Sequence, residues 1–180
     1  MSNKVYAFET DTVWGFGCSP QDDEAIEKIY EIKNRDRTKP LILMSNSLEH
    51  LLPYVENPPD EALDLMQKHF PGALTVVLKK SLLCPDSICA GFDTVGLRVP
   101  AHQGFWTLCD SVEGKVLATT SANISNEPPC ADYEECCEKF SSVATVIKPN
   151  PPKAPSGAAS TVVTFYPEFK VLRQGDVALG

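Results

Sequence analysis

Short runs rich in β-branched and aromatic residues alternate with amphipathic helical patterns along this chain, and that alternation restricts the folds open to it. The expected strands are residues 5–8, 39–45, 71–80, 94–100, 115–123, 143–149, 160–166 and 169–175. The expected helices are residues 21–33, 47–55, 59–69, 101–112 and 131–140. Strands and helices in alternation predict an α/β fold, here a single-domain twisted mixed sheet with flanking helices.

The length of the chain fits one domain over residues 1–180. A chain of 180 residues with 43% hydrophobic residues can bury a sizeable core. No apolar run approaches the ~20 residues needed to span a bilayer, and residues 1–10 lack the apolar stretch of a secretory signal. We therefore expect a cytoplasmic protein without a membrane segment.

The cysteine pattern argues against a metal site. The seven cysteines are an odd number, none forms a CxxC pair, and the three histidines are scattered. We expect no metal bound by the chain's own side chains, and reduced thiols that pack as small hydrophobes.

Positive charge is concentrated in one stretch of a chain whose net charge is −8. Residues 33–39, KNRDRTK, hold Lys33, Arg35, Arg37 and Lys39 at alternating positions. An extended backbone would turn all four cations to one face. The stretch is then either a solvated charged loop or an anion site. The acidic remainder makes a large nucleic-acid interface improbable, because such an interface needs a basic face.

Four polar clusters share one kind of position, at the end of an expected strand or in the loop after it. They are residues 10–15 (TDTVWG), 33–39, 119–123 (TTSAN) and 157–163 (GAASTVV). Strand ends in open α/β sheets are where ligands usually bind. Each cluster alone has an ordinary structural interpretation, as a turn, a charged loop, a helix cap or a strand edge. Arg98 is harder to explain that way, since a cation inside an apolar strand needs a partner or a ligand.

Familiar catalytic patterns are missing from the sequence. It holds no GxxxxGK[ST] loop and no GxGxxG, and His50, His69 and His102 lie on or beside expected helices, away from the Ser/Thr clusters. What remains is an inventory of guanidinium and ammonium groups, hydroxyls and amides. Such groups suit phosphate chemistry carried out by positioning and charge neutralisation.

Six segments occur in the order typical of one family: TDTVWGFG, IKNRDRTKPLILM, FPGALTVVL, VGLRVPAH, LATTSANISNEPP and STVV. They resemble the YrdC/TsaC family of threonylcarbamoyl-AMP synthases, and the match runs from about residue 5 to residue 175. The resemblance implies a YrdC-like fold with a positively charged concave surface. It also implies a nucleotidyltransferase that makes L-threonylcarbamoyladenylate from L-threonine, bicarbonate and ATP and releases pyrophosphate. Downstream transfer proteins would use the product to modify tRNA at position 37, while direct tRNA binding by this acidic chain would be weak or absent.

The resemblance implies nucleotide contacts for five residues besides Asn123. Lys33 and Arg35, which match the family's KxR pair, would hold the ATP phosphates, with Lys39 beside them. Thr94 and Arg173 would contact the nucleotide. The basic stretch would then be a triphosphate clamp.

The resemblance places other residues around threonine. Thr12, Arg98 and Ser160 would bind this substrate, with Arg98 near its carboxylate. Ser121 and Asn123 match the family's SxN pair between the substrates, with Ser121 expected on threonine and Asn123 on ATP. The KxR and SxN pairs together are the expected catalytic residues.

The implied reaction proceeds through a carbamate. Threonine and bicarbonate would form N-carboxy-threonine, whose carboxylate oxygen attacks the α-phosphorus of ATP as pyrophosphate leaves. Mg²⁺ that arrives with ATP would lower the charge barrier. No metal ligand from the protein is expected.

Three positions depart from the family pattern. Glu9 stands where the family usually has Pro, Met44 where many members carry a His that contacts threonine, and Ala159 where Pro usually precedes STVV. Met44 and Glu9 leave open a nucleotide- or RNA-binding paralogue without synthase activity. A second alternative is a carbamoyl-transfer domain like that of hydrogenase maturation proteins, although those larger chains also carry zinc-finger and acylphosphatase domains.

Overall fold

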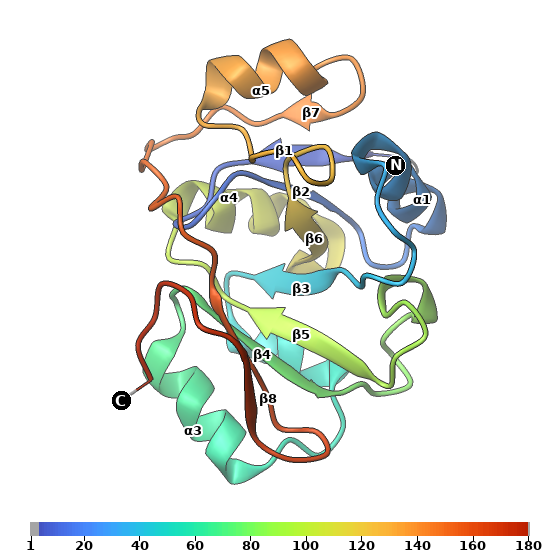
Figure 1. Cartoon of the computed structure of the whole chain (residues 1–180), viewed down its shortest axis with the longest axis vertical. Coiled ribbons are helices and arrows are strands. Elements are labelled where there is room, and N and C mark those ends of the chain that lie inside the picture. The colour runs from blue at the N-terminus through green and yellow to red at the C-terminus, as the bar shows by residue number, and fades with distance from the viewer. Residues whose placement is uncertain (1–3, 180) are drawn as a thin grey trace.

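The computed structural model describes residues 4–179, which form a twisted mixed β-sheet with flanking helices (Figure 1). The strands are β1 (Tyr6–Phe8), β2 (Gly15–Cys18), β3 (Ile42–Ser45), β4 (Leu74–Lys79), β5 (Thr94–Arg98), β6 (Val116–Ser121), β7 (Thr145–Val146), β8 (Thr161–Thr164) and β9 (Lys170–Arg173). The α-helices are α1 (Asp23–Lys33), α2 (Leu48–Leu51), α3 (Asp60–His69), α4 (Gln103–Ser111) and α5 (Tyr133–Phe140). Short 3₁₀ turns occur at Leu52–Tyr54, Asp86–Ile88 and Glu113–Lys115.

The strand order in the described part of the chain is β7-β1-β2-β6-β3-β5-β4-β8-β9. Three pairs are parallel, β1 with β7, β3 with β5 and β4 with β8, and the other neighbouring pairs are antiparallel. The predicted mixed α/β sheet with flanking helices is therefore confirmed. Every expected strand and helix has a counterpart, with shorter bounds in most cases.

Strand β2 was not predicted, because the sequence suggested a turn after β1. Its two glycines serve close packing instead: a Cβ on Gly15 or Gly17 would lie 2.9 Å from the Phe8 ring. Phe16, between them, points to the opposite face of the sheet and packs edge-on against Phe140 of α5, with ring centroids 4.8 Å apart. The glycines thus allow one face of β2 to be covered by an aromatic ring of the neighbouring strand.

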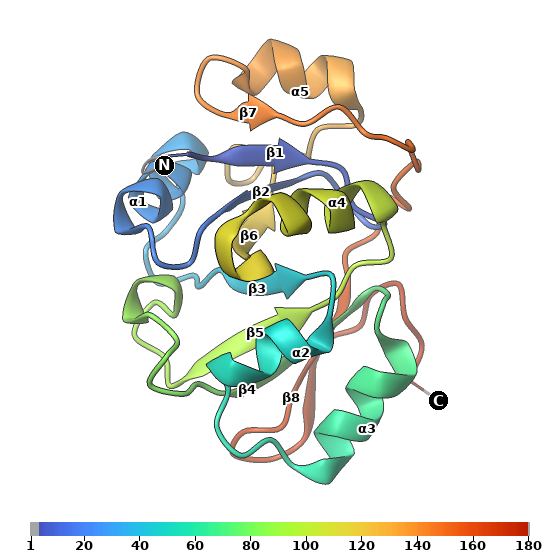
Figure 2. The same ribbon diagram turned by 180° about the vertical axis from the view of Figure 1, so that it is seen from behind.

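The helices lie on both sides of the sheet. Helices α2 and α4 lie toward the viewer in Figure 2, and Phe105 of α4 packs against Phe8 with a centroid distance of 4.9 Å. From the other side, in Figure 1, the segment that joins β7 to β8 runs across the sheet. Within residues 4–179, no helix combines the length and apolar character required of a membrane span.

Helix α1 ends inside the basic stretch. The Asp22 carboxylate accepts a hydrogen bond from the Ala25 amide at 3.1 Å at the start of the helix. Asn34 ends the helix in the left-handed conformation, with φ 51°. Lys33 therefore belongs to the helix, and the chain turns away after it. Residues 33–39 therefore do not form the extended backbone that would turn all four cations to one face.

All seven cysteines fall in the described residues and are free thiols, six of them buried. Burial raises the pKa of Cys18 and that of Cys109 to about 12, so both stay protonated at neutral pH. These thiols act as the small hydrophobes that the sequence predicted.

Candidate active site

Residues from all four polar clusters meet at a cavity of about 420 Å³. Six of the expected site residues line it: Thr12, Arg35, Arg98, Ser121, Ser160 and Arg173. Three of these are arginines, and none of the described residues that line the cavity is Asp or Glu. The lining is therefore suited to an anionic ligand.

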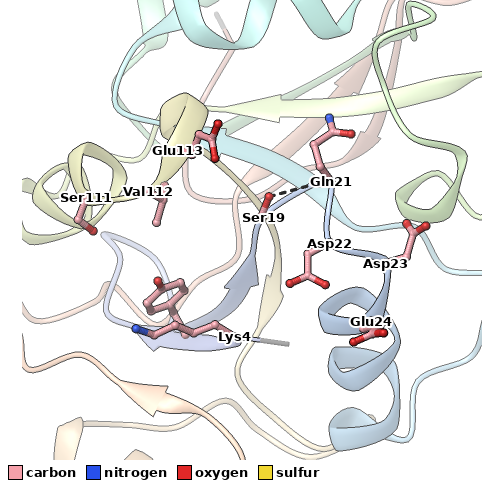
Figure 3. Close-up of a pocket in the computed structure, with 10 residues that line it drawn as sticks. Lys4, Ser19, Gln21, Asp22, Asp23, Glu24, Ser111, Val112 and Glu113 are labelled. Atoms are coloured by element: carbon pink, nitrogen blue, oxygen red, sulfur yellow. Dashed lines mark hydrogen bonds between the residues drawn. The ribbon is translucent and has the colours of Figure 1, made fainter. Parts of the chain in front are cut away.

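A second cavity, of about 710 Å³, lies elsewhere and has the opposite character (Figure 3). Asp22, Asp23, Glu24 and Glu113 line it, with Lys4 as a cation among them. These four carboxylates would repel a polyphosphate. Its larger volume does not make it the better candidate, because the expected site residues lie around the other cavity.

Arg98 reaches the cavity from the end of β5 and has a buried ion partner. Its guanidinium forms an ion pair with Asp11, and its second terminal nitrogen donates to Thr12 Oγ1 at 3.0 Å. Its Nε donates to the Gly72 carbonyl at 3.2 Å. The other Asp11 oxygen accepts from the Ala101 amide at 3.0 Å. Burial lowers the pKa of Arg98 from its ordinary value, and the charge of Asp11 opposes that shift.

Asp11 is a functional candidate that the sequence did not single out. It lies between two residues of the first polar cluster, but its pairing with Arg98 joins positions far apart in the chain. Three of the five N–H groups of Arg98 have protein acceptors within the described residues, so two remain for a ligand carboxylate. Asp11 thus neutralises a buried cation without consuming its whole donor set.

Thr10 and Thr12 have different roles in the same loop. Thr10 Oγ1 donates to the Val13 carbonyl at 2.5 Å and accepts from the Thr12 and Val13 amides, which is the turn-capping role considered for this cluster. The Thr12 hydroxyl accepts from Arg98 and lines the cavity. Both threonines line the cavity, and Thr12 is the one that the sequence predicted as a ligand contact.

Lys33 is buried, with 1% of its surface exposed, and it does not line the cavity. Its Nζ donates to the Ser121 carbonyl at 2.7 Å, to the Asn123 carbonyl at 3.0 Å and to Asn123 Oδ1 at 2.7 Å. Asn123 Oδ1 also accepts from the Ser121 hydroxyl at 2.6 Å. Lys33 therefore joins the end of α1 to residues 121–123, and through Asn123 it orients Ser121 toward the cavity.

The other cations of residues 33–39 separate in space. Arg35 lines the cavity and is held by the carbonyls of Pro40, at 2.9 Å, and Lys39, at 3.4 Å. Arg37 pairs with Glu27 at 2.6 Å on the exposed side of α1. The Lys39 side chain is exposed and does not line the cavity. One guanidinium of the stretch, that of Arg35, faces the cavity.

Of the remaining expected residues, Arg173 and Ser160 line the cavity and Thr94 does not. Arg173 Nε donates to the Ser160 carbonyl at 3.0 Å, and the Ser160 hydroxyl is 2.9 Å from Thr75 Oγ1. Thr94 begins β5 beside Lys79, at the opposite end of the strand from Arg98, and does not line the cavity. Its contact with a nucleotide stays a prediction.

Two of the three departures from the family pattern, Met44 and Glu9, differ in their position relative to the cavity. Met44 is buried and lines the cavity, paired with Arg98 in the parallel β3–β5 register. A thioether therefore forms an apolar wall next to the buried guanidinium. Glu9 lies outside the cavity and pairs with His102 at 2.8 Å.

No metal-binding cluster of three or more His, Cys, Asp or Glu side chains occurs within residues 4–179. The cavity lining itself offers hydroxyls and guanidinium groups, which are poor sole ligands for a divalent cation.

Protonation of Lys33 makes the stability of the fold depend on pH. Burial, and then the charges of Arg35 and Lys39, lower the pKa of Lys33 from 10.5 to about 7. Between these values the unfolded chain holds a proton that the folded protein has released, so the unfolding free energy rises with pH. The gain is complete above pH 10.5 and is lost as pH falls through about 7.

We expect Lys33→Met to remove this rise. Urea unfolding of wild type and of Lys33→Met at about pH 6 and about pH 9 measures the change in unfolding free energy between the two pH values. The other titrating groups are common to both proteins, so their contribution cancels when the two changes are subtracted. Parallel pH dependences for the two proteins would contradict the assignment.

The chain matches the Sua5/YciO/YrdC family model, described as telomere recombination, over residues 1–175. It is 36% identical to a threonylcarbamoyl-AMP synthase of Vibrio campbellii over 141 residues, which cover 77% of this chain and 76% of that protein. It is 39% identical to a threonylcarbamoyl-AMP synthase of Pyrococcus abyssi over 137 residues, 76% of this chain and 40% of that protein.

A solved relative also supports the fold. The crystal structure of P. abyssi Sua5 complexed with L-threonine is 34% identical, with a TM-score of 0.87 over 96% of this chain. This chain spans 51% of that one, about half its length. The similarity extends over nearly the whole sequence and over the whole fold. The chain therefore belongs to the Sua5/YciO/YrdC family.

Proposed function

We propose that this chain makes L-threonylcarbamoyladenylate from L-threonine, bicarbonate and ATP, with release of pyrophosphate. Relatives that are 33–39% identical carry the name threonylcarbamoyl-AMP synthase, and a Sua5 structure contains L-threonine. The observation that carries the proposal is the cavity, which combines three arginines with the hydroxyls of Thr12, Ser121 and Ser160 and no lining carboxylate.

The residues of the cavity suit the carboxylate of threonine and the polyphosphate of ATP. Two donors of Arg98 remain for the threonine carboxylate, while Thr12 and Ser160 offer hydroxyls to the rest of the amino acid. Arg35 and Arg173, which also line the cavity, would bind the polyphosphate. Lys33 and Asn123 act behind the lining by fixing the loop that presents Ser121.

The proposed reaction needs no covalent bond to the protein. The threonine nitrogen takes up the carbon of bicarbonate with loss of water, and the resulting carbamate oxygen bonds to the α-phosphorus. The bond from that phosphorus to the bridging oxygen breaks, and pyrophosphate carries the electron pair away. The arginines stabilise the charge that spreads over the phosphate oxygens.

We propose that Mg²⁺ enters with ATP as part of the substrate. Mg²⁺ commonly keeps several waters and bonds to substrate phosphates rather than to a protein cage. A cavity with hydroxyls and without carboxylates fits that arrangement. Lys39 and Thr94 do not line the cavity, so they would contact only a part of the nucleotide that extends outside it.

The product would pass to proteins that transfer the threonylcarbamoyl group to tRNA. The substrates and the tRNA are cytoplasmic, and we place the activity there. The net charge of −8 favours little direct contact with tRNA. A paralogue that only binds nucleotide is the competing function, and a pyrophosphate assay separates the two.

The test is pyrophosphate release, which we expect only when threonine, bicarbonate and ATP are all present. With 2-aminobutyrate in place of threonine, turnover should fall by at least about tenfold, because the hydroxyl partners in the site would be left unpaired. L-Serine, which keeps the hydroxyl and lacks the methyl group, is the matched control and should be an intermediate substrate. Equal turnover of threonine and 2-aminobutyrate would contradict the assigned hydroxyl contacts, and no release in any mixture would favour the paralogue.

A further inference from the structure

A buried polar contact outside the cavity joins parts of the chain that the proposed chemistry does not use. Glu9 Oε1 accepts from His102 Nε2 at 2.8 Å and from the Lys153 amide at 2.7 Å. Glu9 and His102 are 8% and 2% exposed. His102 Nδ1 accepts from the Phe105 amide at 3.0 Å and caps α4, so Nε2 carries the ring proton and donates the hydrogen bond to Glu9. The contact links the end of β1, the start of α4 and the segment before β8.

That segment, residues 147–159, is here called the strap. It leaves β7 at one edge of the sheet and reaches β8 near the other edge, running across the sheet in Figure 1. At its start, Ile147 and Pro149 are partly buried, and Ile147 packs against the apolar cluster that holds Phe8 and Phe105. Beyond them, residues 150–159 are exposed apart from Pro155, which is partly buried. Apolar packing therefore contributes little to the position of residues 150–159, and polar contacts must hold them.

Beyond Ile147, whose amide donates to the Ala7 carbonyl at 2.8 Å, residues 150–157 of the strap are attached at two places. In its middle, the Lys153 amide donates to Glu9, and Lys153 Nζ donates to the Ala101 carbonyl at 2.8 Å. Near its end, the Ser156 and Gly157 amides donate to the carbonyls of Asp11 and Thr12, at 3.0 and 2.8 Å. The second attachment is to the loop that carries the partner of Arg98.

The end of the strap forms part of the cavity wall. Gly157 and Ala159 line the cavity, and Ser160 follows at once. Glu9 and His102 do not line it. An effect of this pair on substrates therefore passes either through the strap or through residues 10–12, which follow Glu9 directly in the chain, and a change in the strap alone separates the two routes.

We propose that Glu9 and His102 form a positioning unit that holds the strap across the cavity and so sets the affinity for substrate. The role in substrate binding rests on the proposed function, whereas the role in holding the strap does not. With the middle attachment released, the strap would keep its contacts to Asp11 and Thr12 for a smaller fraction of the time. The wall near Ser160 would then be formed less often, which raises KM for threonine and leaves kcat near its starting value.

Limited trypsin cleavage measures the position of the strap without any assay of activity. The strap holds one cleavable bond, after Lys153, because Lys148 precedes Pro149. We expect trypsin to cleave the Glu9→Ala variant at this bond about tenfold faster than wild type. A rise of this size follows when a segment that opens locally loses one or two ordinary hydrogen bonds. Glu9→Gln keeps an acceptor oxygen and should stay close to wild type. Glu168→Ala, a change at an exposed glutamate in the turn before β9, is the matched control.

The same variants are then assayed for threonine KM and kcat. The proposal requires a KM about tenfold higher in Glu9→Ala, rescued by Glu9→Gln, with kcat retained. Unchanged cleavage in Glu9→Ala overturns the positioning unit, and faster cleavage with unchanged KM overturns its role for substrate. If no protein releases pyrophosphate, the proposed function fails while cleavage still decides the first part.

A second variant guards against misfolding of Glu9→Ala. Lys153→Pro removes both contacts of the middle attachment, the amide donor to Glu9 and the Nζ donor to the Ala101 carbonyl, and leaves the Glu9–His102 pair intact. We expect faster hydrogen exchange at the Ser156 and Gly157 amides and the same rise in KM. Wild-type exchange at both amides would overturn the proposal.

Discussion

Replacing Arg98 with Met is expected to destabilise the fold by about 3–5 kcal/mol, because one partner of a buried ion pair is removed. Asp11 would remain as a buried carboxylate without its cation, and Thr12 Oγ1 and the Gly72 carbonyl would lose a donor. Urea unfolding measures the loss. In the fraction that folds, kcat/KM for threonine should fall at least about a hundredfold, since a charged hydrogen-bonding partner of the carboxylate is gone.

A double variant separates the two effects. Arg98→Met combined with Asp11→Leu removes both charges, and the unfolding free energy should recover by several kcal/mol because no unpaired charge is buried. Activity should not recover, because the substrate still lacks its guanidinium. An Arg98→Met protein within about 1 kcal/mol of wild type would show that the ion pair does not hold this part of the fold.

The secondary structure was largely predictable because its signals are local. Helix α1 has an Asp at its cap, acids in its first turn and apolar residues at helical spacing, all readable in the sequence. Strand β2 was missed because two glycines normally indicate a turn. Only the tertiary packing reveals that Gly15 and Gly17 lie under the ring of Phe8.

The site was predictable as a set of clusters but not as a set of contacts. Polar residues at strand ends indicated where a ligand would bind, and the cavity lies there. Burial of Lys33 was not predictable, because lysine is rarely buried and its three acceptors come from residues about ninety positions away. Asp11 and the Glu9–His102 pair were missed for the same reason, since each partner is distant in sequence.

Arg35 is the cation of the basic stretch that faces the cavity, and its loss should reduce catalysis strongly. The carbonyls of Pro40 and Lys39 hold its guanidinium from one side, so its orientation is set before a ligand binds. Losing one preorganised donor to developing charge costs ~3 kcal/mol in the transition state, roughly a hundredfold in rate. Arg35→Ala should therefore release pyrophosphate about a hundredfold more slowly than wild type.

Arg37 provides the internal control, because it lies two residues away and carries the same charge. It pairs with Glu27 on an exposed surface, where an ion pair contributes little to stability, and it does not line the cavity. Arg37→Ala should keep a rate within about twofold of wild type, while Arg35→Lys should be impaired because an ammonium cannot reproduce the guanidinium fork. Thermal melts confirm that each variant is folded. Equal losses of rate in Arg35→Ala and Arg37→Ala would mean that residues 33–39 act through their net charge alone. Near-wild-type rates in Arg35→Ala, Arg35→Lys and Arg37→Ala would show that the stretch is a solvated loop without a role in catalysis.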